Sequence, residues 1–263
     1  MAITYKVDKL YPWLYRFSDP LDVYFYLIVG KKEALLFDTG FGIGDIEGAV
    51  RKITKLPLTV VLGHAHIDHA NGAYQFEKVY LHKGDYDLYR QHTSADTRLG
   101  ILQNLKQKGL ELDQNHGTWV ASGAADLSPL EYDKVFDLGG LKVKVINMAG
   151  HTAGSVGLLI LEKKVLLDSD SANGHCWLFL EETLPLREYI AMLKRVYELD
   201  FDAFYTAHNK EKFPKDLFEA YIAVAKNANL AEAKPYERMS ALKPFVYTEG
   251  DVSIVFSERT LKG

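Results

Sequence analysis

The sequence predicts an α/β fold, because strand-like and helix-like segments alternate along most of its length. Runs rich in Tyr, Leu and Val between residues 3 and 37 are broken by turn-forming clusters, which is typical of β-strands. Apolar residues at helical spacing follow over 46–53, and a further strand is expected at 58–62. The alternation resumes at residue 136. A protein of the α/β class shows this kind of order.

Each element has its own signal. Asp45 is the predicted N-cap of the helix over 46–53, which should end before Pro57. Gly63 should end the strand 58–62, and the histidine-rich segment after it should form a loop that leads into a short helix at 71–76. The later predicted elements are strands within 136–168, a helix at 186–197, a strand at 201–206, a helix at 215–228 and a terminal hairpin at 245–247 and 252–256.

Residues 84–130 interrupt this order. Leu99, Leu102 and Leu105 have the spacing of an amphipathic helix, and a loose loop with no obvious strand should follow them. We interpret the segment as an inserted helical cap, because long insertions are usually functional or disordered. Such a cap is expected to cover the functional site of the protein and to contribute to substrate selectivity. A chain of 263 residues with 48% hydrophobic content can otherwise fold as a single domain over 1–263.

Composition excludes several classes of partner. The net charge of −4 and the scattered Lys and Arg residues argue against nucleic acid. The longest apolar run, Tyr24 to Val29, is too short to span a membrane. Cys176 has no cysteine to pair with, and the polar N-terminal segment lacks the features of a signal peptide, so we expect a cytoplasmic protein. A small-molecule substrate fits best, and a homo-oligomer is compatible with the sequence.

One short segment carries the strongest chemical signal. Residues 64–69 read His-Ala-His-Ile-Asp-His, which places four metal-ligand side chains within six residues. Imidazole suits zinc, manganese or iron, and alternate side chains of an extended turn can converge on one ion while their neighbours face a second ion. The pattern therefore predicts a metal site.

With this motif, the chain resembles the metallo-β-lactamase superfamily along nearly its whole length apart from 84–130. The resemblance implies an αββα sandwich with two mixed β-sheets flanked by helices. A strand ending in Asp38-Thr39-Gly40 matches the family's first motif, whose Asp orients metal-binding groups. Gly-His-Thr-Ala-Gly-Ser at 150–155 matches the third motif and assigns His151, and His208 after a late strand matches the fifth.

The fourth family motif, an apolar strand ending in Thr-Gly-Asp, departs from its usual form here. In Asp168-Ser169-Asp170 a serine replaces the glycine, and Asp170 aligns best with the bridging carboxylate, with Asp168 as the alternative. The resemblance then implies a first metal ion bound by three side chains, a second ion bound by three others, and Asp170 between the two ions. The first set is His64, His66 and His151, and the second is Asp68, His69 and His208.

These ligands predict a binuclear metal-dependent hydrolase, with zinc as the expected metal and iron or manganese as alternatives. Two divalent cations, two carboxylates and a bridging hydroxide would leave the site with a charge of about +1, which stabilises an oxyanion. Asp68 and Asp170 are the predicted catalytic carboxylates. We expect hydrolysis of a small ester, thioester or lactone by the metal-bridging hydroxide. An iron-dependent persulfide dioxygenase-like or other redox activity, or phosphodiester hydrolysis, is the alternative.

Differences between this sequence and several branches of the superfamily narrow the choice of activity. Zinc β-lactamases generally carry Cys or Ser where Asp170 stands, and the best-known acyl-homoserine lactonases have a tyrosine where Asn173 stands. Flavodiiron proteins have Glu at the position of His66 and an additional flavodoxin-like domain. Glyoxalase II adds a helical C-terminal domain, whereas this chain ends in the predicted hairpin.

Some side chains outside the motifs are candidates for substrate contact, although packing is an equally simple role for them. His82 and His92, in contrast, are expected to be solvated. The candidates are His116, Trp119, His175, Trp177 and Tyr205.

Overall fold

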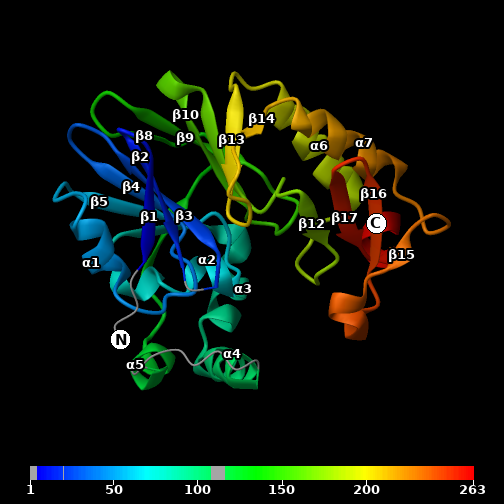
Figure 1. Cartoon of the computed structure of the whole chain (residues 1–263), viewed down its shortest axis with the longest axis horizontal. Coiled ribbons are helices and arrows are strands. Elements are labelled where there is room, and N and C mark those ends of the chain that lie inside the picture. The colour runs from blue at the N-terminus through cyan, green and yellow to red at the C-terminus, as the bar shows by residue number, and fades with distance from the viewer. Residues whose placement is uncertain (1–4, 20, 108–115) are drawn as a thin grey trace. The chain divides into compact units, whose positions relative to one another are not determined.

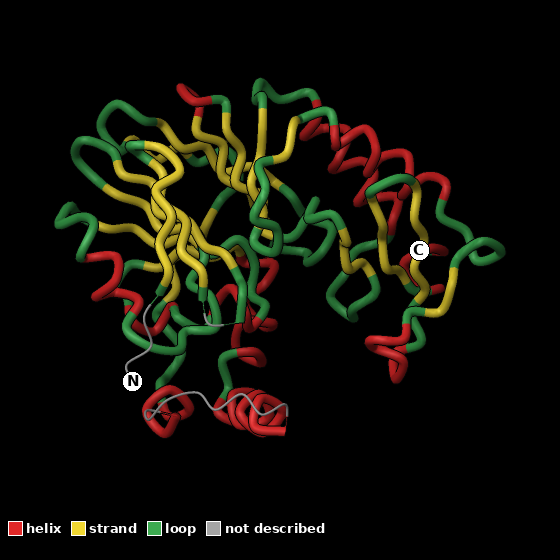
Figure 2. The backbone as a smooth tube through the Cα atoms, viewed as in Figure 1, coloured by secondary structure: helices red, strands yellow, loops and turns green. Residues whose placement is uncertain are grey.

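The computed structural model describes residues 5–19, 21–107 and 116–263. Tertiary contacts divide the chain into two compact units. The first comprises residues 1–130 and 136–141, and the second comprises residues 131–135 and 142–263. Figure 1 labels many of the elements, and Figure 2 colours the strands and helices along the backbone. The predicted α/β class is confirmed.

A seven-stranded mixed sheet forms the first unit, in the order β1-β2-β3-β4-β5-β6-β7. The first four strands pair antiparallel, and β4 to β7 pair parallel. Its strands are β1 Lys6–Tyr11, β2 Leu14–Ser18, β3 Tyr24–Val29, β4 Ala34–Phe37, β5 Leu58–Val61, β6 Val79–His82 and β7 Leu127–Leu130. Its helices are α1 Ile46–Arg51, α2 Ile67–Ala70, α3 Tyr86–His92, α4 Ala95–Gln107 and α5 His116–Ala121.

The apolar pattern explains how this sheet and its helices pack. Phe17 and Phe25, on adjacent strands, stack with ring centroids 5.0 Å apart and are fully buried. Ile46 and Val50 lie four residues apart on α1, so both enter the same core. Asp45 caps α1 as predicted, because its carboxylate accepts a hydrogen bond from the Gly48 backbone N–H at 2.7 Å.

A six-stranded sheet in the order β14-β13-β11-β10-β9-β8 belongs mainly to the second unit. Its strands are β8 Val135–Asp137, β9 Lys142–Asn147, β10 Val156–Ile160, β11 Val165–Ser169, β13 Ala203–Thr206 and β14 Phe213–Pro214. A four-stranded sheet in the order β12-β17-β16-β15 follows. It consists of β12 His175–Leu178, β15 Lys234–Pro235, β16 Phe245–Glu249 and β17 Val252–Phe256. Helices α6 Leu186–Tyr197, α7 Leu217–Asn227 and α8 Glu258–Lys262 complete the unit.

Helix α6 is amphipathic, as its sequence predicts. Tyr189, Met192, Leu193 and Val196 recur at helical spacing and are buried in one core with Phe218 of α7. This core also receives Cys176 and Leu178 from β12. The terminal hairpin expected from the sequence is β16 and β17, which pair antiparallel around Gly250.

The structure corrects several expectations for residues 71–130. The helix expected at 71–76 is instead the short α2 at Ile67–Ala70 followed by a 3₁₀ turn at Ala73–Gln75. The described part of the insertion contains the helices α3, α4 and α5, but it also ends in a strand, β7, which pairs with β6. Helix α4 also departs from the expected amphipathic pattern, in which Leu99 should face the interior. Leu99 is 45% exposed, whereas the neighbouring Arg98 is 1% exposed. The side chain of Leu105 is not among those that the structure describes.

Candidate metal centre

The first group of predicted ligands lies where two parallel strands end. Strands β4 and β5 pair parallel, so their carboxyl ends meet at the same edge of the sheet. Asp38 directly follows β4, and the segment 64–69 follows β5 after Leu62 and Gly63. Loops at this edge of parallel sheets commonly carry binding and catalytic groups. The arrangement brings the Asp38-Thr39-Gly40 motif next to the histidine-rich segment 64–69.

The imidazoles of the histidine-rich segment are packed against one another. Nε2 of His64 lies 3.0 Å from Nδ1 of His66, and the ring centroids of His64 and His69 are 4.1 Å apart. All three rings are buried. Two ring nitrogens at this distance repel unless a proton or a cation lies between them, since each neutral imidazole has one nitrogen lone pair. A neutral N–H···N hydrogen bond meets this condition, and both residues also belong to a group of side chains that could hold a metal ion.

Asp38 fixes the ring of His69. Its Oδ2 lies 3.1 Å from Nδ1 of His69, while its Oδ1 accepts a hydrogen bond from the Gly63 backbone N–H at 2.6 Å. Both side chains are buried. With Nδ1 engaged by a carboxylate, Nε2 is the ring nitrogen of His69 that could bind a metal ion, and ligating histidines are usually held in this way. The φ angle of Asp38 is +65°, a strained conformation of the kind that persists at functional sites.

Asp68 and the adjacent backbone complete this cluster. Oδ2 of Asp68 lies 3.5 Å from Nε2 of His69, and the Asp68 side chain is 23% exposed. The carbonyl oxygen of His69 accepts hydrogen bonds from both the backbone N–H and the hydroxyl of Thr39, each at 2.8 Å. The motif that contains Asp38 therefore holds the backbone as well as the ring of His69.

The second group of predicted ligands lies at one edge of the six-stranded sheet. Because β9 and β11 are both antiparallel to β10, they run in the same direction, and β11 pairs parallel with β13. The segments after β9, β11 and β13 therefore leave the sheet at the same edge. They carry His151, Asp170 and His208, respectively.

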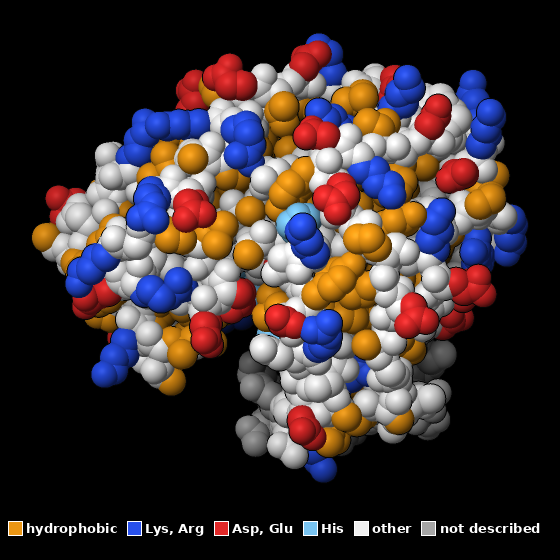
Figure 3. Space-filling view, turned by 180° about the vertical axis from the view of Figure 1, so that it is seen from behind, with side chains coloured by type: hydrophobic (Ala, Val, Ile, Leu, Met, Phe, Trp, Pro, Cys, Tyr) orange, Lys and Arg blue, Asp and Glu red, His pale blue; other side chains and the backbone are white. Residues whose placement is uncertain are grey.

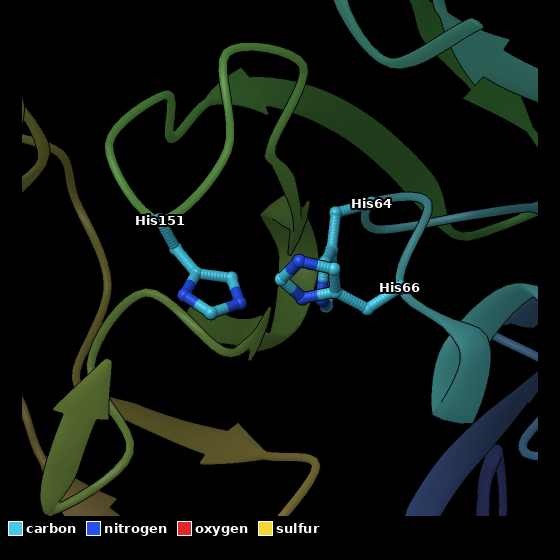
Figure 4. A group of neighbouring side chains, drawn as sticks. All are labelled: His64, His66 and His151. Atoms are coloured by element: carbon cyan, nitrogen blue, oxygen red, sulfur yellow. The ribbon is translucent and has the colours of Figure 1, made fainter. Parts of the chain in front are cut away.

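Contacts within this group place Asp170 beside both histidines. Its Oδ2 lies 3.0 Å from Nε2 of His208 and 3.8 Å from Nε2 of His151. Nδ1 of His151 is 2.7 Å from the backbone carbonyl oxygen of Trp177, so it donates to that oxygen and Nε2 is the ring nitrogen that could bind a metal ion. Figure 4 shows His151 on the loop after β9, and His64 and His66 on the loop after β5.

The turn that holds His151 is shaped by its neighbours. The Thr152 backbone N–H donates to the Ser155 hydroxyl at 3.1 Å, and the two hydroxyls lie 2.8 Å apart. A Cβ atom added at Gly150 would come within 2.7 Å of the Tyr189 ring, so helix α6 requires a glycine at that position. These contacts explain the residue types that flank His151 in the third motif.

Asp168 and Asp170 have different surroundings. Asp168 is fully buried at the end of β11, and burial, followed by the neighbouring charge of Asp170, raises its pKa to about 8. The histidine contacts belong to Asp170. Ser169 between them has a φ of +61°, a left-handed conformation that glycine adopts without strain. The serine thus keeps the backbone geometry for which a glycine is the usual residue.

All seven predicted ligands occur in groups of His and Asp side chains, within the described segments, that could hold a metal ion. The chain therefore has the donor set of a metal-binding protein.

The residues predicted as substrate contacts differ in their placement. Trp119 is 4% exposed, and its indole N–H donates to the Phe41 carbonyl oxygen at 2.9 Å. Tyr205 is buried in β13. His116 begins α5, but its side chain lies outside the described part. Of this set, Trp119 and Tyr205 are thus integrated into the protein interior.

His175 and Trp177 are half-buried on β12, where the intervening Cys176 enters the core. Tyr236 lies beside both rings, with centroid distances of 5.3 Å to His175 and 6.1 Å to Trp177. The Arg238 guanidinium lies over the Trp177 ring at 5.3 Å. Burial, and then the charge of Arg238, lowers the pKa of His175. This aromatic face is connected to His151 through the Trp177 carbonyl.

The expectation that His82 and His92 are solvated was wrong for His82. His82 is 9% exposed, and its Nδ1 accepts a hydrogen bond from the Gly84 backbone N–H. The ring of His92 stacks with that of His66 at a centroid distance of 5.3 Å, so it belongs to the surroundings of the metal-ligand segment.

Sequence reasoning missed two buried polar residues near this segment. Asn71 is fully buried at the C-terminus of α2, and Arg98 reaches it from α4 with a 2.7 Å hydrogen bond from Nε to Oδ1. Asn71 lies two residues after His69, and this closeness to the histidine-rich segment could have marked it as a candidate. Nothing in the pattern of α4 marked Arg98, because an arginine on a helix is usually solvated.

The surface carries charges of both signs on the face drawn in Figure 3, where Lys and Arg side chains are interspersed with Asp and Glu side chains. None of the helices in the described segments combines the length and the hydropathy needed to cross a bilayer.

Comparison with known proteins places this geometry in a family. Residues 18–208 match the model of the metallo-beta-lactamase superfamily. The human protein named acyl-coenzyme A thioesterase MBLAC2 is 22% identical over 189 residues, which cover 66% of this chain and 67% of the relative. Such relatives support a metallo-hydrolase.

Solved structures share the fold. A metallo-beta-lactamase family protein from Thermus thermophilus has a TM-score of 0.56 at 21% identity, covering 81% of this chain and 79% of that chain. A protein described as TTHA1623 in a di-iron-bound form has a TM-score of 0.56 at 24% identity, covering 75% and 92%. The family match spans most of the described chain and includes all seven candidate ligands. The chain therefore belongs to the metallo-beta-lactamase superfamily.

Proposed function

We propose that this protein is a binuclear metal-dependent hydrolase that cleaves a small ester, thioester or lactone. In this proposal His64, His66 and His151 hold one metal ion, Asp68, His69 and His208 hold the second, and Asp170 contributes to both. Each of these residues belongs to a group that could hold an ion. Zinc is the proposed metal, since imidazole and carboxylate donors suit it, although the same donors accept iron or manganese.

The single observation that carries the proposal is that two of the proposed ligand imidazoles are each anchored through Nδ1. His69 is engaged at Nδ1 by the Asp38 carboxylate, and His151 is engaged at Nδ1 by the Trp177 carbonyl. Ligating histidines typically use one ring nitrogen for such an anchor and the other for the metal. The residues present therefore fit divalent ions in donor type and in ring orientation.

Bound divalent ions would supply a water of lowered pKa and would polarise a substrate carbonyl. The carboxylate of Asp68 is suited to accept a hydrogen bond from the attacking water and to orient it, because its side chain is partly exposed beside His69. Asp170 offsets part of the positive charge that the site would carry. A negative charge that develops on the carbonyl oxygen would be stabilised in such a site.

A thioester is the proposed first substrate class. The named activity of the human relative, an acyl-coenzyme A thioesterase, supports it, as does the carboxylate Asp170 at the fourth motif. A thiolate is a good leaving group, so this cleavage requires no separate general acid. The half-buried aromatic face of His175 and Trp177 is the proposed substrate contact.

The location and organisation of the protein are part of the same proposal. We place it in the cytoplasm, since its single cysteine is free and buried. We also propose that residues 1–263 form a single metallo-β-lactamase-fold domain, with residues 84–130 as a helical cap insertion. A homo-oligomer and a small-molecule substrate are compatible with this assignment.

Elemental analysis of protein purified without chelator, combined with a substrate panel, tests the proposal. The expected result is two transition-metal ions per chain and turnover of aryl esters, thioesters or lactones that is lost on chelation and restored by metal. One iron per chain with oxygen consumption on a persulfide would instead identify a dioxygenase. Turnover of phosphodiesters alone would refute the carbonyl substrate.

A further inference from the structure

Arg98 is a buried cation held by neutral groups. Its Nη1 donates to the backbone carbonyls of Trp119 and Ser122, and to the Ser122 hydroxyl at 2.7 Å, while its Nε donates to Oδ1 of Asn71. The faces of Tyr74 and Trp119 lie 5.6 Å and 5.8 Å from the guanidinium. Within the described part of the chain it has no carboxylate partner. A charge buried in this way is costly, so its contacts call for an explanation beyond packing.

Arg98 determines how the Asn71 amide is oriented. A guanidinium can only donate hydrogen bonds, so the group facing it must be the amide oxygen. The Asn71 nitrogen then faces the other way and donates to the carbonyl oxygens of Ile67 at 3.0 Å and His92 at 3.1 Å. Ile67 begins α2, the turn that carries Asp68 and His69. Arg98 thus acts on this turn through one amide side chain.

The same turn is held from a second direction by the first motif. Thr39 donates twice to the His69 carbonyl oxygen, and its hydroxyl accepts a hydrogen bond from the Gly72 backbone N–H at 3.1 Å. This leaves α2, with four residues, clamped between Thr39 and Asn71. Because so short a helix has little stability of its own, the position of its backbone depends on tertiary contacts such as these two clamps.

The insertion supplies two of the three hydrogen-bond partners of the Asn71 side chain, His92 and Arg98. Arg98 lies on α4, His92 ends α3, and Trp119 and Ser122 belong to α5 and the residue after it. Trp119 also donates to the Phe41 carbonyl, three residues after Asp38. The insertion is therefore hydrogen-bonded to the segment after β4, through Trp119, and to Asn71 at the end of α2, through Arg98.

We propose that Arg98 is a positioning residue, and that residues 84–130 act through Arg98 and Asn71 to hold Asp68 and His69 in the orientation that the second metal ion requires. This inference rests on the binuclear function proposed above. It assigns the insertion a role in metal affinity in addition to the substrate selectivity expected of a cap.

Titration of the metal-free full-length chain with Co²⁺, followed by visible absorption and calorimetry, tests the role. Arg98→Met keeps the length of the side chain but removes its donors. It should weaken the second binding event at least about tenfold, as supporting residues of metal ligands commonly do, and change the first by less than about twofold. His208→Ala, which removes a ligand of the second site, identifies which event is the second. Arg98→Lys should fall between the wild type and Arg98→Met, because lysine replaces a subset of the contacts.

Arg90→Met is the matched control, because Arg90 lies in the same insertion but is exposed and pairs with the exposed Asp87. It should bind both ions as the wild type does. Should Arg98→Met not fold, Asn71→Ser provides the test, since serine can still accept from Arg98 but cannot donate to both carbonyls.

The outcomes separate this inference from the proposed function. A wild type that binds fewer than two ions contradicts the binuclear function itself. A wild type that binds two ions, together with unchanged affinities in Arg98→Met or Asn71→Ser, overturns the role of Arg98. Equal weakening of both binding events would also overturn it, because that result indicates a general loss of stability.

Discussion

The carboxylate of Asp38 lies 3.1 Å from Nδ1 of His69, and both groups are buried. The contact joins the residue after β4 to the segment after β5, and it leaves Nε2 of His69 directed away from the carboxylate. Removal of the negative charge should therefore weaken the hold on the ring and reduce the basicity of its metal-binding nitrogen.

Asp38→Asn should lower metal affinity about 10- to 100-fold, measured by competition with a chromophoric chelator. Asparagine tolerates a positive φ, so the backbone conformation at this position can be kept. Asp133→Asn is the control, because Asp133 also has a positive φ, of 62°, but forms an exposed ion pair with Lys144. Equal affinities in the two variants would show that the Asp38 contact is dispensable.

Asp170 and Asp168 should respond differently to the same substitution. Asp170→Asn should lose metal, and Asp170→Ala should reduce kcat at least about 100-fold, because the carboxylate that balances the charge of the site is removed. Asp168→Asn should retain the wild-type metal content, since burial favours the neutral acid, which an amide resembles in shape. Metal loss in Asp168→Asn with full retention in Asp170→Asn would assign the ligand to Asp168 instead.

Trp177 should contribute to substrate binding. Trp177→Leu should raise KM for thioesters about tenfold with little change in metal content, because the backbone carbonyl that anchors His151 is kept while the half-buried ring is lost. Trp13→Leu is the control, since Trp13 is also half-exposed and stacks on Tyr11. An unchanged KM in Trp177→Leu for every accepted substrate would remove this residue from the substrate site.

Much of the fold and the ligand set could be predicted from the sequence because their signals are local. The spacing of Tyr189, Leu193 and Val196 gave α6, and the motif at 64–69 needs no distant residue to be recognised. The ends of parallel strands gather such motifs at one edge, which explains why Asp38 lies beside His69.

The errors occurred where distant contacts decide the structure. Strand β7 has a short sequence containing a proline, and its conformation depends on pairing with β6. The buried position of Arg98 depends on acceptors in Asn71, Trp119 and Ser122, which no helical pattern reveals. The buried position of Trp119 likewise depends on a distant residue, because its indole N–H donates to the carbonyl oxygen of Phe41.

Cys176 should resist alkylation in the native protein. Burial raises the pKa of its thiol to about 12, so the reactive thiolate is scarce at neutral pH, and the side chain is fully enclosed. Incubation with iodoacetamide followed by mass spectrometry should show no modification unless denaturant is added. Rapid labelling of the folded chain would contradict the packing of β12 against its core.

Asp19 should make stability depend on pH. It is 5% exposed, and its carboxylate accepts hydrogen bonds from the backbone N–H groups of Leu21, Val23 and Phe41. Burial nevertheless outweighs these bonds and raises its pKa to about 6. The folded state then binds more protons than the unfolded state between the ordinary Asp pKa of about 4 and the folded value.

The free energy of unfolding of the metal-free protein should therefore be highest below about pH 4 as far as this group is concerned. It should fall as the pH rises to about 6, by at most about 3 kcal/mol, and remain level above that. Urea denaturation at several pH values measures this dependence, and chelation keeps metal binding from contributing. Asp19→Asn should remove that part of the slope, whereas Asp22→Asn, at a nearby exposed position, should leave it intact. A wild-type slope that persists unchanged in Asp19→Asn would place the responsible proton on another group.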